Sequence, residues 1–600
     1  MSDFGASRRT TQPLLGAGVG VLLATACAVT YTWRGYHPIL LILMVLAVAV
    51  VAWSLRDTAT PVRIGIGRAD VLALAILLAV MAPLYLWRLY TVPWQVNTDE
   101  VTIMNAARDM LRAPNADPLG LSWYFGFPTA IFVVFGWLGQ QLGGIDLFHM
   151  RLLHALFGLG CVGLGYGLFR QFTTPLRAVV PAVLLGANHA LVGISRMAMR
   201  DNTGLFFELL ALLLLVRGLQ RSSRTLTVLG GAATGLTYYT YFPSRITLVL
   251  WCLVLGLLWL RQPRRPALRR LMGSGLLCLL GWAMVAAPVV IASVQHKDLA
   301  FGYQRQQFLF YPEGQALEQS WTSTATPTAA WKANIRQGLA TFNGGLHDQG
   351  YIYPNYGHGF VDPITGALIW VGLIVALTRN KRSPDACLPD LLAATGFLVL
   401  YLAFAFVITK APNYTRLLVS LPFVAWLAGS GLWWLAERIG ALVSGGQRNT
   451  QRDRVVATLA LLTVGVIVAA NVRIFRDFVS TGVEKGNDVG GTARMVEAQR
   501  GDPGHAWILA ASDTQRYYGW GNNYQWQTWM GFFAAPDQPV TVLPPADLDT
   551  LTVGGRFTLF IPRSAWLERE AGFRARYAVD SVLNVVPDGR LVAVKGSAPR

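Results

Sequence analysis

Long apolar segments recur along this chain and constrain its fold more than any other feature. A run of about 20 apolar residues crosses the hydrocarbon core of a bilayer. Only 14% of the residues are charged and the mean hydropathy is +0.42, whereas a soluble domain carries about 25% charged residues. The sequence therefore predicts an α-helical polytopic membrane protein. The expected spans are 14–33, 39–55, 69–90, 151–169, 178–195, 203–219, 226–242, 246–260, 271–294, 363–378, 390–409, 416–436 and 454–473.

Basic residues gather in alternate connections between these segments. With the N-terminus in the cytoplasm, the clusters at 261–270 and 379–382 fall on the cytoplasmic side, as the positive-inside rule requires. This holds only if the shorter apolar stretch 127–142 does not cross but lies in the interface or dips into it. We therefore expect about thirteen spans in the plasma (inner) membrane, with the C-terminus outside. The formal net charge of +18 then reflects topology, not a nucleic-acid partner, which would need one accessible basic patch.

Three regions follow from this pattern. Residues 1–68 hold two additional N-terminal spans. Residues 69–473 form the membrane core, with outer loops at 91–150 and 295–362. Residues 474–600 are more polar and contain three short apolar runs, "AWILAAS", "VTVLPP" and "FTLFIPRS", which are typical of buried strands, and the helix-like "RSAWLERE". We expect a small extracytoplasmic α/β domain here.

An acidic pair, Asp99 and Glu100, opens the first outer loop. Apolar residues at 101, 103, 104, 107, 110 and 111 predict an amphipathic helix that ends before Pro114. The pair can serve that helix as an N-terminal cap and as favourable charge at its positive end. The same position suits a carboxylate that accepts a proton from a bound hydroxyl or amine. The two roles are compatible with each other.

Further unusual polar residues fall on the same outer side. Cationic residues there run against the positive-inside trend, and arginine matches phosphate oxygens well, so anion recognition would explain them. Anchoring of aromatic and cationic side chains at the interface is the alternative. These residues are Arg200, Asp201, Tyr241, Arg245, Arg305, Lys410, Tyr414 and Arg416.

Two histidines of the long outer loop, His347 and His358, lie near Asp348 and Asp362. The spacing of these four residues is loose, so they favour a hydrogen-bonded loop network over a metal site. The aromatic run 517–533 in the C-terminal domain has two interpretations, a core that also contacts the membrane interface or a surface that stacks on sugars.

Taken in order, several motifs resemble GT-C membrane glycosyltransferases, in the branch of the protein O-mannosyltransferases and the lipid A aminoarabinose transferase. They are "TDEVTIMNAARDML", "WYFGFPTAIFVVFGWLGQ", "HMRLLHALFGLG", "SRMAMRD", "GLTYYTYFPSR" and "PNYTRLLVSLPF". The "PPLYY" element of that branch is replaced by "YFGFP". The resemblance spans roughly residues 70–435.

The resemblance implies transfer of a sugar, with inversion, from a polyprenyl-phosphate carrier to a protein, glycan or lipid acceptor at the outer membrane face. Asp99 would be the general base, with Glu100 and Asp201 orienting it or the acceptor. Arg200, Arg245, Lys410, Arg416 and Arg305 are candidates for the donor phosphate. Tyr241, Tyr414, His347 and His358 are candidates for substrate contact. Some relatives hold a divalent ion and others do not, so the metal stays open, and no other cofactor is expected.

Three alternatives stay open at this point. A transporter would carry its charges near the bilayer midplane and often shows inverted repeats. A binding or sensing protein would rely on the C-terminal domain and need no acidic centre. A polysaccharide ligase or polymerase would use a polyprenyl-diphosphate carrier. Convergence of Asp99, Asp201 and the outer cationic residues on one site would favour the glycosyltransferase.

Overall fold

The computed structural model describes residues 4–598 apart from 57–66, 95, 114–115, 123–124, 262–264, 350–352, 354–356, 380–383, 448, 482–487, 511–522 and 586–588. The first half of the chain is helical: α1 (Phe4–Arg34), α2 (Ile39–Ser54), α3 (Arg68–Leu86), α4 (Thr98–Arg112), α5 (Ala130–Leu142), α6 (Leu147–Phe169), α7 (Pro175–Gly186), α8 (His189–Ser195), α9 (Asp201–Gln220), α10 (Arg224–Leu236), α11 (Ile246–Arg261) and α12 (Arg265–Gln295).

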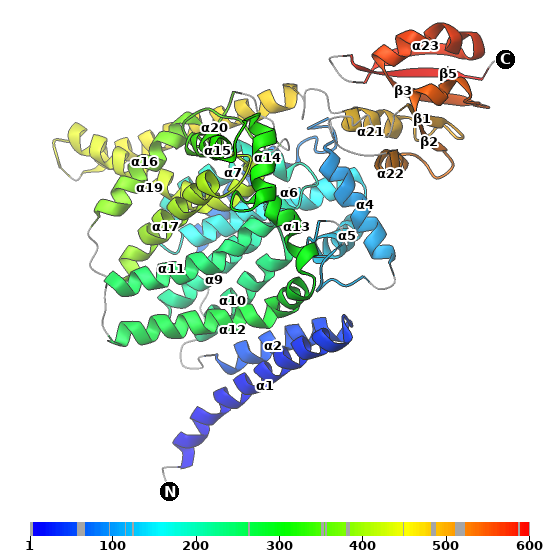
Figure 1. Cartoon of the computed structure of the whole chain (residues 1–600). Coiled ribbons are helices and arrows are strands. Elements are labelled where there is room, and N and C mark those ends of the chain that lie inside the picture. The colour runs from blue at the N-terminus through cyan, green and yellow to red at the C-terminus, as the bar shows by residue number, and fades with distance from the viewer. Residues whose placement is uncertain are drawn as a thin grey trace.

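The second half adds helices of the long outer loop, the last spans and the C-terminal domain. They are α13 (Lys297–Gln307), α14 (Pro312–Thr322), α15 (Pro327–Leu339), α16 (Pro363–Thr378), α17 (Pro384–Phe406), α18 (Tyr414–Leu417), α19 (Leu421–Val443), α20 (Thr450–Thr481), α21 (Asp488–Ala498), α22 (Asn523–Phe533) and α23 (Arg563–Arg576). The helix bundle and the C-terminal domain are shown in Figure 1.

The helical membrane architecture is confirmed, but the count of thirteen spans is not. Within the described ranges, nine helices are long and apolar enough to cross a membrane, or ten if the bent pair α7 and α8 forms one span. The remaining expected spans correspond to α2, α10 and α16, which have 16, 13 and 16 residues. At about 1.5 Å per residue these helices are about 20–24 Å long, less than the hydrocarbon core of about 30 Å. The interfacial stretch 127–142 contains α5, which has 13 residues and is also short.

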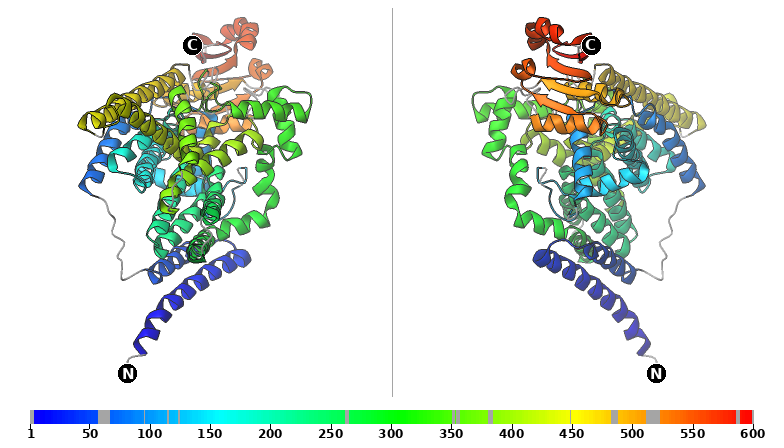
Figure 2. Two further views of the ribbon diagram at one scale, coloured as in Figure 1. Left: turned by 90° about the vertical axis from the view of Figure 1, so that its left-hand side faces the viewer. Right: turned by 90° about the vertical axis from the view of Figure 1, so that its right-hand side faces the viewer.

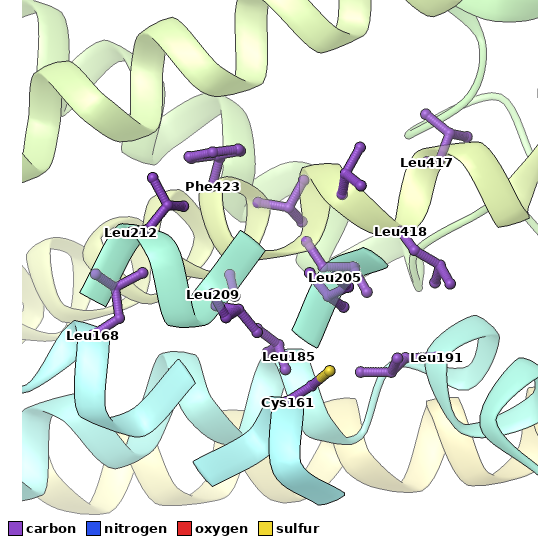
Figure 3. Packing of buried hydrophobic residues seen from close by; sticks show 14 of the residues in the cluster. Cys161, Leu168, Leu185, Leu191, Leu205, Leu209, Leu212, Leu417, Leu418 and Phe423 are labelled. Carbon is purple, nitrogen blue, oxygen red and sulfur yellow. The ribbon is translucent and has the colours of Figure 1, made fainter. Parts of the chain in front are cut away.

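The core of the bundle lies where α6, α7, α9 and α19 meet. Cys161, Leu185, Leu209, Leu212 and Phe423 pack there with almost no exposure, as the close view in Figure 3 shows. This packing holds α9, whose first residue, Asp201, belongs to the candidate site.

The two N-terminal helices form a hairpin at the edge of the bundle. α1 and α2 pack on each other, and their other neighbours are α12 and α10. Figure 2 shows α1 extending away from the rest of the molecule. The hairpin therefore packs on the core through α10 and α12. The division at residue 68 stays a prediction, and it falls beside residues 57–66, which lie outside the described residues.

The C-terminal domain contains one five-stranded sheet. Its strands are β1 (Ala506–Ala510), β2 (Val540–Leu543), β3 (Arg556–Pro562), β4 (Ala578–Asn584) and β5 (Leu591–Ser597), in the order β2-β1-β3-β5-β4. β1 pairs in parallel with β2 and β3, and β5 pairs antiparallel with β3 and β4. All three strands predicted from the sequence are present. The preceding helix α20 continues to Thr481, so the predicted boundary at 473 falls inside a helix.

One hydrophobic cluster joins this domain to the first outer loop. Met104 on α4 and Met150 on α6 are buried in the same cluster as Trp507 on β1 and Trp529 on α22. The described part of the aromatic run 517–533 thus contributes core, whereas residues 517–522 lie outside the described residues. Figure 1 shows α21 and α22 beside α4 at one end of the bundle. The candidate base and the C-terminal domain therefore share one packed unit.

Candidate active site

The start of α4 is fixed by a capping box. The side chain of Asn97 accepts a hydrogen bond from the Asp99 N–H at 2.8 Å, and the Asn97 N–H donates to Oε2 of Glu100 at 2.9 Å. Asn97 is thus the cap, and Asp99 lies in the first helical turn with its side chain half-buried. Because Asn97 and Glu100 already satisfy the helix end, the carboxylate of Asp99 is not needed as a cap.

Glu100 is fully buried in a two-pronged ion pair with Arg151 of α6. Nε of Arg151 donates to Oε1 at 2.9 Å and Nη2 donates to Oε2 at 3.1 Å. The Ala198 N–H also donates to Oε1 at 2.8 Å. All these bonds tie α4 to α6 and to the connection before α9. Both carboxylate oxygens of Glu100 are therefore occupied by Arg151, Ala198 and Asn97. That Glu100 orients Asp99 or the acceptor stays a prediction.

Three buried arginines hold the backbone that leads into α4. Arg151 donates to the carbonyl of Pro93 at 2.7 Å. Arg196 donates to the carbonyls of Leu84 and Trp87 at 2.6 Å and of Val92 at 3.0 Å. Arg494, on α21, donates to the carbonyl of Trp94 at 2.6 Å and to that of Tyr90 at 2.5 Å. Hydrogen bonds from these three guanidinium groups to backbone carbonyls therefore hold this segment, which we call the 84–94 strap.

Asp99 lies in an electrostatic group with Arg200 and Asp201. The charge of Arg200 acts on both carboxylates, and Asp99 and Asp201 act on each other. Burial raises the pKa of the Asp99 carboxyl, and the positive charge of Arg200 opposes that rise. The guanidinium of Arg200 lies 4.3 Å from the ring centre of Phe127 and 5.5 Å from that of Tyr241. One cation is therefore placed between two acids and two aromatic faces.

Tyr241 connects this group to Arg416. Its hydroxyl lies 3.1 Å from Oγ1 of Thr415, and its electrostatic neighbours include Asp201, Arg416 and Arg200. Arg416 is buried, with Nη1 donating to the Thr409 carbonyl at 3.0 Å and Nη2 donating to Gln307 of α13.

Lys410 adds a further positive charge close to Arg416. Its Nζ lies 4.2 Å from the ring centre of Trp321, and its own N–H donates to Oε2 of Glu318 at 2.7 Å. Burial and the nearby charge of Arg416 lower the pKa of Lys410 to about 8, although Glu318 opposes this. Lys410 is therefore a cation near neutrality that loses its proton in mildly alkaline solution.

Two predicted phosphate ligands have other surroundings. The guanidinium of Arg245 lies over the ring of Tyr238 at 5.5 Å and donates to the Tyr238 carbonyl at 3.4 Å. Arg305 is half-buried on α13, two residues before Gln307. Both stay sequence predictions.

Tyr414, His347 and His358 belong to a loop network beside this group. The Tyr414 hydroxyl oxygen lies 2.8 Å from the carbonyl oxygens of both Leu346 and His358 and can donate to either, and its backbone N–H donates to Oδ1 of Asp348 at 2.8 Å. Nε2 of His358 lies 3.3 Å from Oδ2 of Asp477. Hydrogen bonding of this kind matches the network favoured by the sequence.

The second loop aspartate, Asp362, caps α16 and accepts from Nδ2 of Asn471 at 2.9 Å. Across the described residues, no three side chains of His, Cys, Asp or Glu are grouped closely enough to hold a metal ion.

Sequence reasoning missed the arginines that hold the 84–94 strap. Arg151 and Arg196 lie in "HMRLLHALFGLG" and "SRMAMRD", at the outer ends of apolar segments, where the positive-inside rule disfavours cations. The reasoning that singled out Arg200 would have found both. No signal in the sequence distinguishes Arg494, because it lies on a polar helix far along the chain.

Comparisons with known proteins bear on this geometry. Residues 129–291 match the family model of dolichyl-phosphate-mannose-protein mannosyltransferases. No curated protein matches the chain in sequence. Among solved structures, apo ArnT from Cupriavidus metallidurans has a TM-score of 0.50 and 14% identity, over 88% of this chain and 98% of that chain.

Two further structures have slightly lower TM-scores. ArnT from the same organism bound to undecaprenyl phosphate has a TM-score of 0.49 and 15% identity, over 88% of this chain and 97% of that chain. The archaeal oligosaccharyltransferase AglB from Archaeoglobus fulgidus, in complex with an inhibitory peptide and a dolichol-phosphate, has a TM-score of 0.48 and 11% identity, over 89% and 74%. The family match over residues 129–291 and the fold shared with apo ArnT together support a membrane glycosyltransferase of the GT-C type, resembling the branch of the protein O-mannosyltransferases and the aminoarabinose transferase.

Proposed function

We propose that this protein transfers a sugar from a polyprenyl-phosphate donor to an acceptor, with inversion, at the membrane face that carries α4 and the C-terminal domain. The observation that carries the proposal is the grouping of Asp99, Arg200 and Asp201 beside Tyr241 and Arg416. These residues come from α4, α9, the connection before α11 and α18. A base and two cations thus converge from separate parts of the chain, as the glycosyltransferase interpretation requires.

Asp99 acts as the general base in this proposal. Its carboxylate takes the proton from the acceptor hydroxyl or amine while the acceptor oxygen or nitrogen bonds to the anomeric carbon of the sugar. The bond from that carbon to the phosphate oxygen breaks, and its electron pair leaves with the lipid phosphate. The leaving group is a stable anion, so no strong general acid is needed. The helix position of Asp99 is set by Asn97 and Glu100, which keeps its carboxylate available.

Arg200 and Arg416 bind the donor phosphate in this proposal, and Lys410 adds a third cation. Arginine donors arranged toward a phosphate stabilise the charge that develops on it as the sugar leaves. Asp201 holds Arg200 in place through its opposite charge. Tyr241, whose ring lies next to Arg200, contributes to the wall of the donor site.

The experiment compares Asp99→Asn with wild type for transfer from radiolabelled polyprenyl-phosphate sugars to acceptors in membranes. Asparagine has nearly the same shape but cannot accept the proton, so we expect a loss of transfer of about 10²-fold or more. The control is Asp109→Asn, which removes an exposed acid of the same helix and should leave transfer unchanged. If Asp99→Asn transfers as fast as wild type while remaining folded, the base lies elsewhere and the proposal fails.

A further inference from the structure

A second polar site lies at the opposite end of the bundle. Between the ends of α16, α19 and α20 there is a cavity of about 630 Å³, and Arg379, Arg438 and Arg452 line it. Ile374 and Val371, about one and two helical turns before Arg379 on α16, form its apolar wall. The cavity thus combines a cluster of guanidinium groups with a surface of aliphatic side chains.

The distance along α20 places this cavity at the other membrane surface from the candidate active site. Arg452 lies 19 residues before Asn471 (471 − 452), and Asn471 bonds to the cap of α16 on the side of the active site. At about 1.5 Å per residue, this separation is about 29 Å, close to the thickness of a hydrocarbon core.

The electrostatics of the cavity favour an anion. Its acidic residue, Glu437, pairs with Arg177 through an N–O distance of 2.6 Å and is therefore neutralised. In the described part of the chain, Arg379, Arg438 and Arg452 pair with no acid, although Arg438 lies 5.3 Å from the ring centre of Trp434. Three positive charges thus face a space open to the membrane surface without a matching negative charge.

We propose that this cavity binds the headgroup of an anionic phospholipid, with the phosphate among Arg379, Arg438 and Arg452. The acyl chains would lie along Val371 and Ile374. Guanidinium groups match phosphate oxygens in pairs, and basic pockets between transmembrane helices are suited to anionic headgroups. A soluble anion would gain nothing from the apolar wall, which is why the proposal commits to a lipid. It does not depend on the proposed glycosyl transfer.

The test uses the full-length protein in detergent, with dioleoylphosphatidylglycerol and dioleoylphosphatidylcholine as probes. Binding is measured by native mass spectrometry and by the shift of the thermal unfolding midpoint. We expect wild type to retain phosphatidylglycerol at least tenfold better than phosphatidylcholine. The triple variant R379Q/R438Q/R452Q should lose that preference.

The matched control is R56Q/R68Q/R261Q, which removes the same charge from three exposed helix-end arginines outside the cavity. It should keep the preference for phosphatidylglycerol. Equal losses in both triple variants would show a general surface-charge effect and overturn the proposal. Equal stabilisation by inorganic phosphate would overturn the lipid assignment. Should the triple variant fail to fold, the single variants R379Q, R438Q and R452Q carry the same test, and three unchanged preferences would contradict it.

Discussion

Nε of Arg494 donates a hydrogen bond to the carbonyl of Trp94 at 2.6 Å, across 400 residues of sequence. Arg494 lies in the C-terminal domain, and Trp94 lies five residues before the candidate base Asp99. The close approach of Gly490 to Val96 strengthens this contact, since a Cβ at Gly490 would lie 2.4 Å from the Val96 carbonyl oxygen. The domain is therefore part of the support of the active site.

Replacing Arg494 should lower turnover without unfolding the domain. In Arg494→Gln the bonds to the carbonyls of Tyr90 and Trp94 are lost, so the 84–94 strap should loosen and Asp99 should leave its productive position. We expect kcat to fall about tenfold or more, with little change in the KM for the donor, because misplacement of a catalytic group slows the chemical step.

The measurement is steady-state transfer together with protease resistance of the C-terminal domain. Arg500→Gln is the control, since Arg500 is exposed near the end of the same domain segment, and its kinetics should match wild type. Arg494→Lys keeps a charge and should recover part of kcat. A variant with normal kcat would show that the strap does not need this arginine.

Breaking the ion pair between Glu100 and Arg151 should destabilise the protein strongly. Glu100→Gln removes one charge of a pair whose side chains are both completely buried, and leaving a buried charge without its partner costs about 3–5 kcal/mol. We expect a large fall in the thermal unfolding midpoint, with any loss of activity following the loss of structure.

A matched surface pair provides the comparison for that prediction. Glu570 and Arg574 form a partly exposed ion pair with an N–O distance of 2.7 Å, and such pairs contribute about 1 kcal/mol or less. Glu570→Gln should therefore leave the midpoint almost unchanged. Similar effects in the two variants would contradict the structural role assigned to Glu100.

The pH dependence of transfer should report the environment of Asp99. A general base works only when ionised, and burial raises the pKa of this carboxyl. Activity should therefore rise with pH through a value above the ordinary aspartate pKa of about 3.9. The measurement is kcat/KM against pH. Arg200→Gln removes the charge that opposes the rise, so in that variant the acid limb should move to still higher pH; an acid limb that stays in place would show that Arg200 does not act on Asp99.

Donor affinity should weaken in alkaline solution because of Lys410. The pKa of this group is lowered to about 8, so it is charged below that pH and neutral above it. If Lys410 binds the donor phosphate, the KM for the donor should rise between pH 7 and pH 9. Arginine stays protonated over this range, so Lys410→Arg should remove the rise. A rise of equal size in Lys410→Arg would assign the effect to another group.

Much of the architecture can be predicted from the sequence, because segments that lie in lipid consist mainly of apolar residues. The apolar segments, the capped amphipathic helix and the strands of the C-terminal sheet all correspond to elements of the structure. The number of spans does not follow in the same way, because α2 and α16 are apolar but short. The pattern of apolar residues identifies such helices. Where each helix begins and ends, and so whether it is long enough to cross the bilayer, depends on its packing against other helices.

The candidate site is only partly predictable for a related reason. Residue type and topology point to Asp99, Arg200 and Asp201, and the structure brings these three together. They do not separate Arg416, which faces the same group, from Arg245, which turns to Tyr238. That difference is a matter of side-chain direction at a helix end. The link from Arg494 to the strap spans the whole chain, and no local pattern records it.

The position of α21 has a consequence for the timing of synthesis. Residues 488–498 leave the ribosome after every apolar span, and they supply Arg494 and Gly490 to the strap. A nascent chain that has already inserted its helices thus lacks the last support of its candidate base. If Asp99 is the base, we expect chains truncated before residue 488 to insert their helices but to lack transfer activity, because they lack the contacts of Arg494 and Gly490 with the strap.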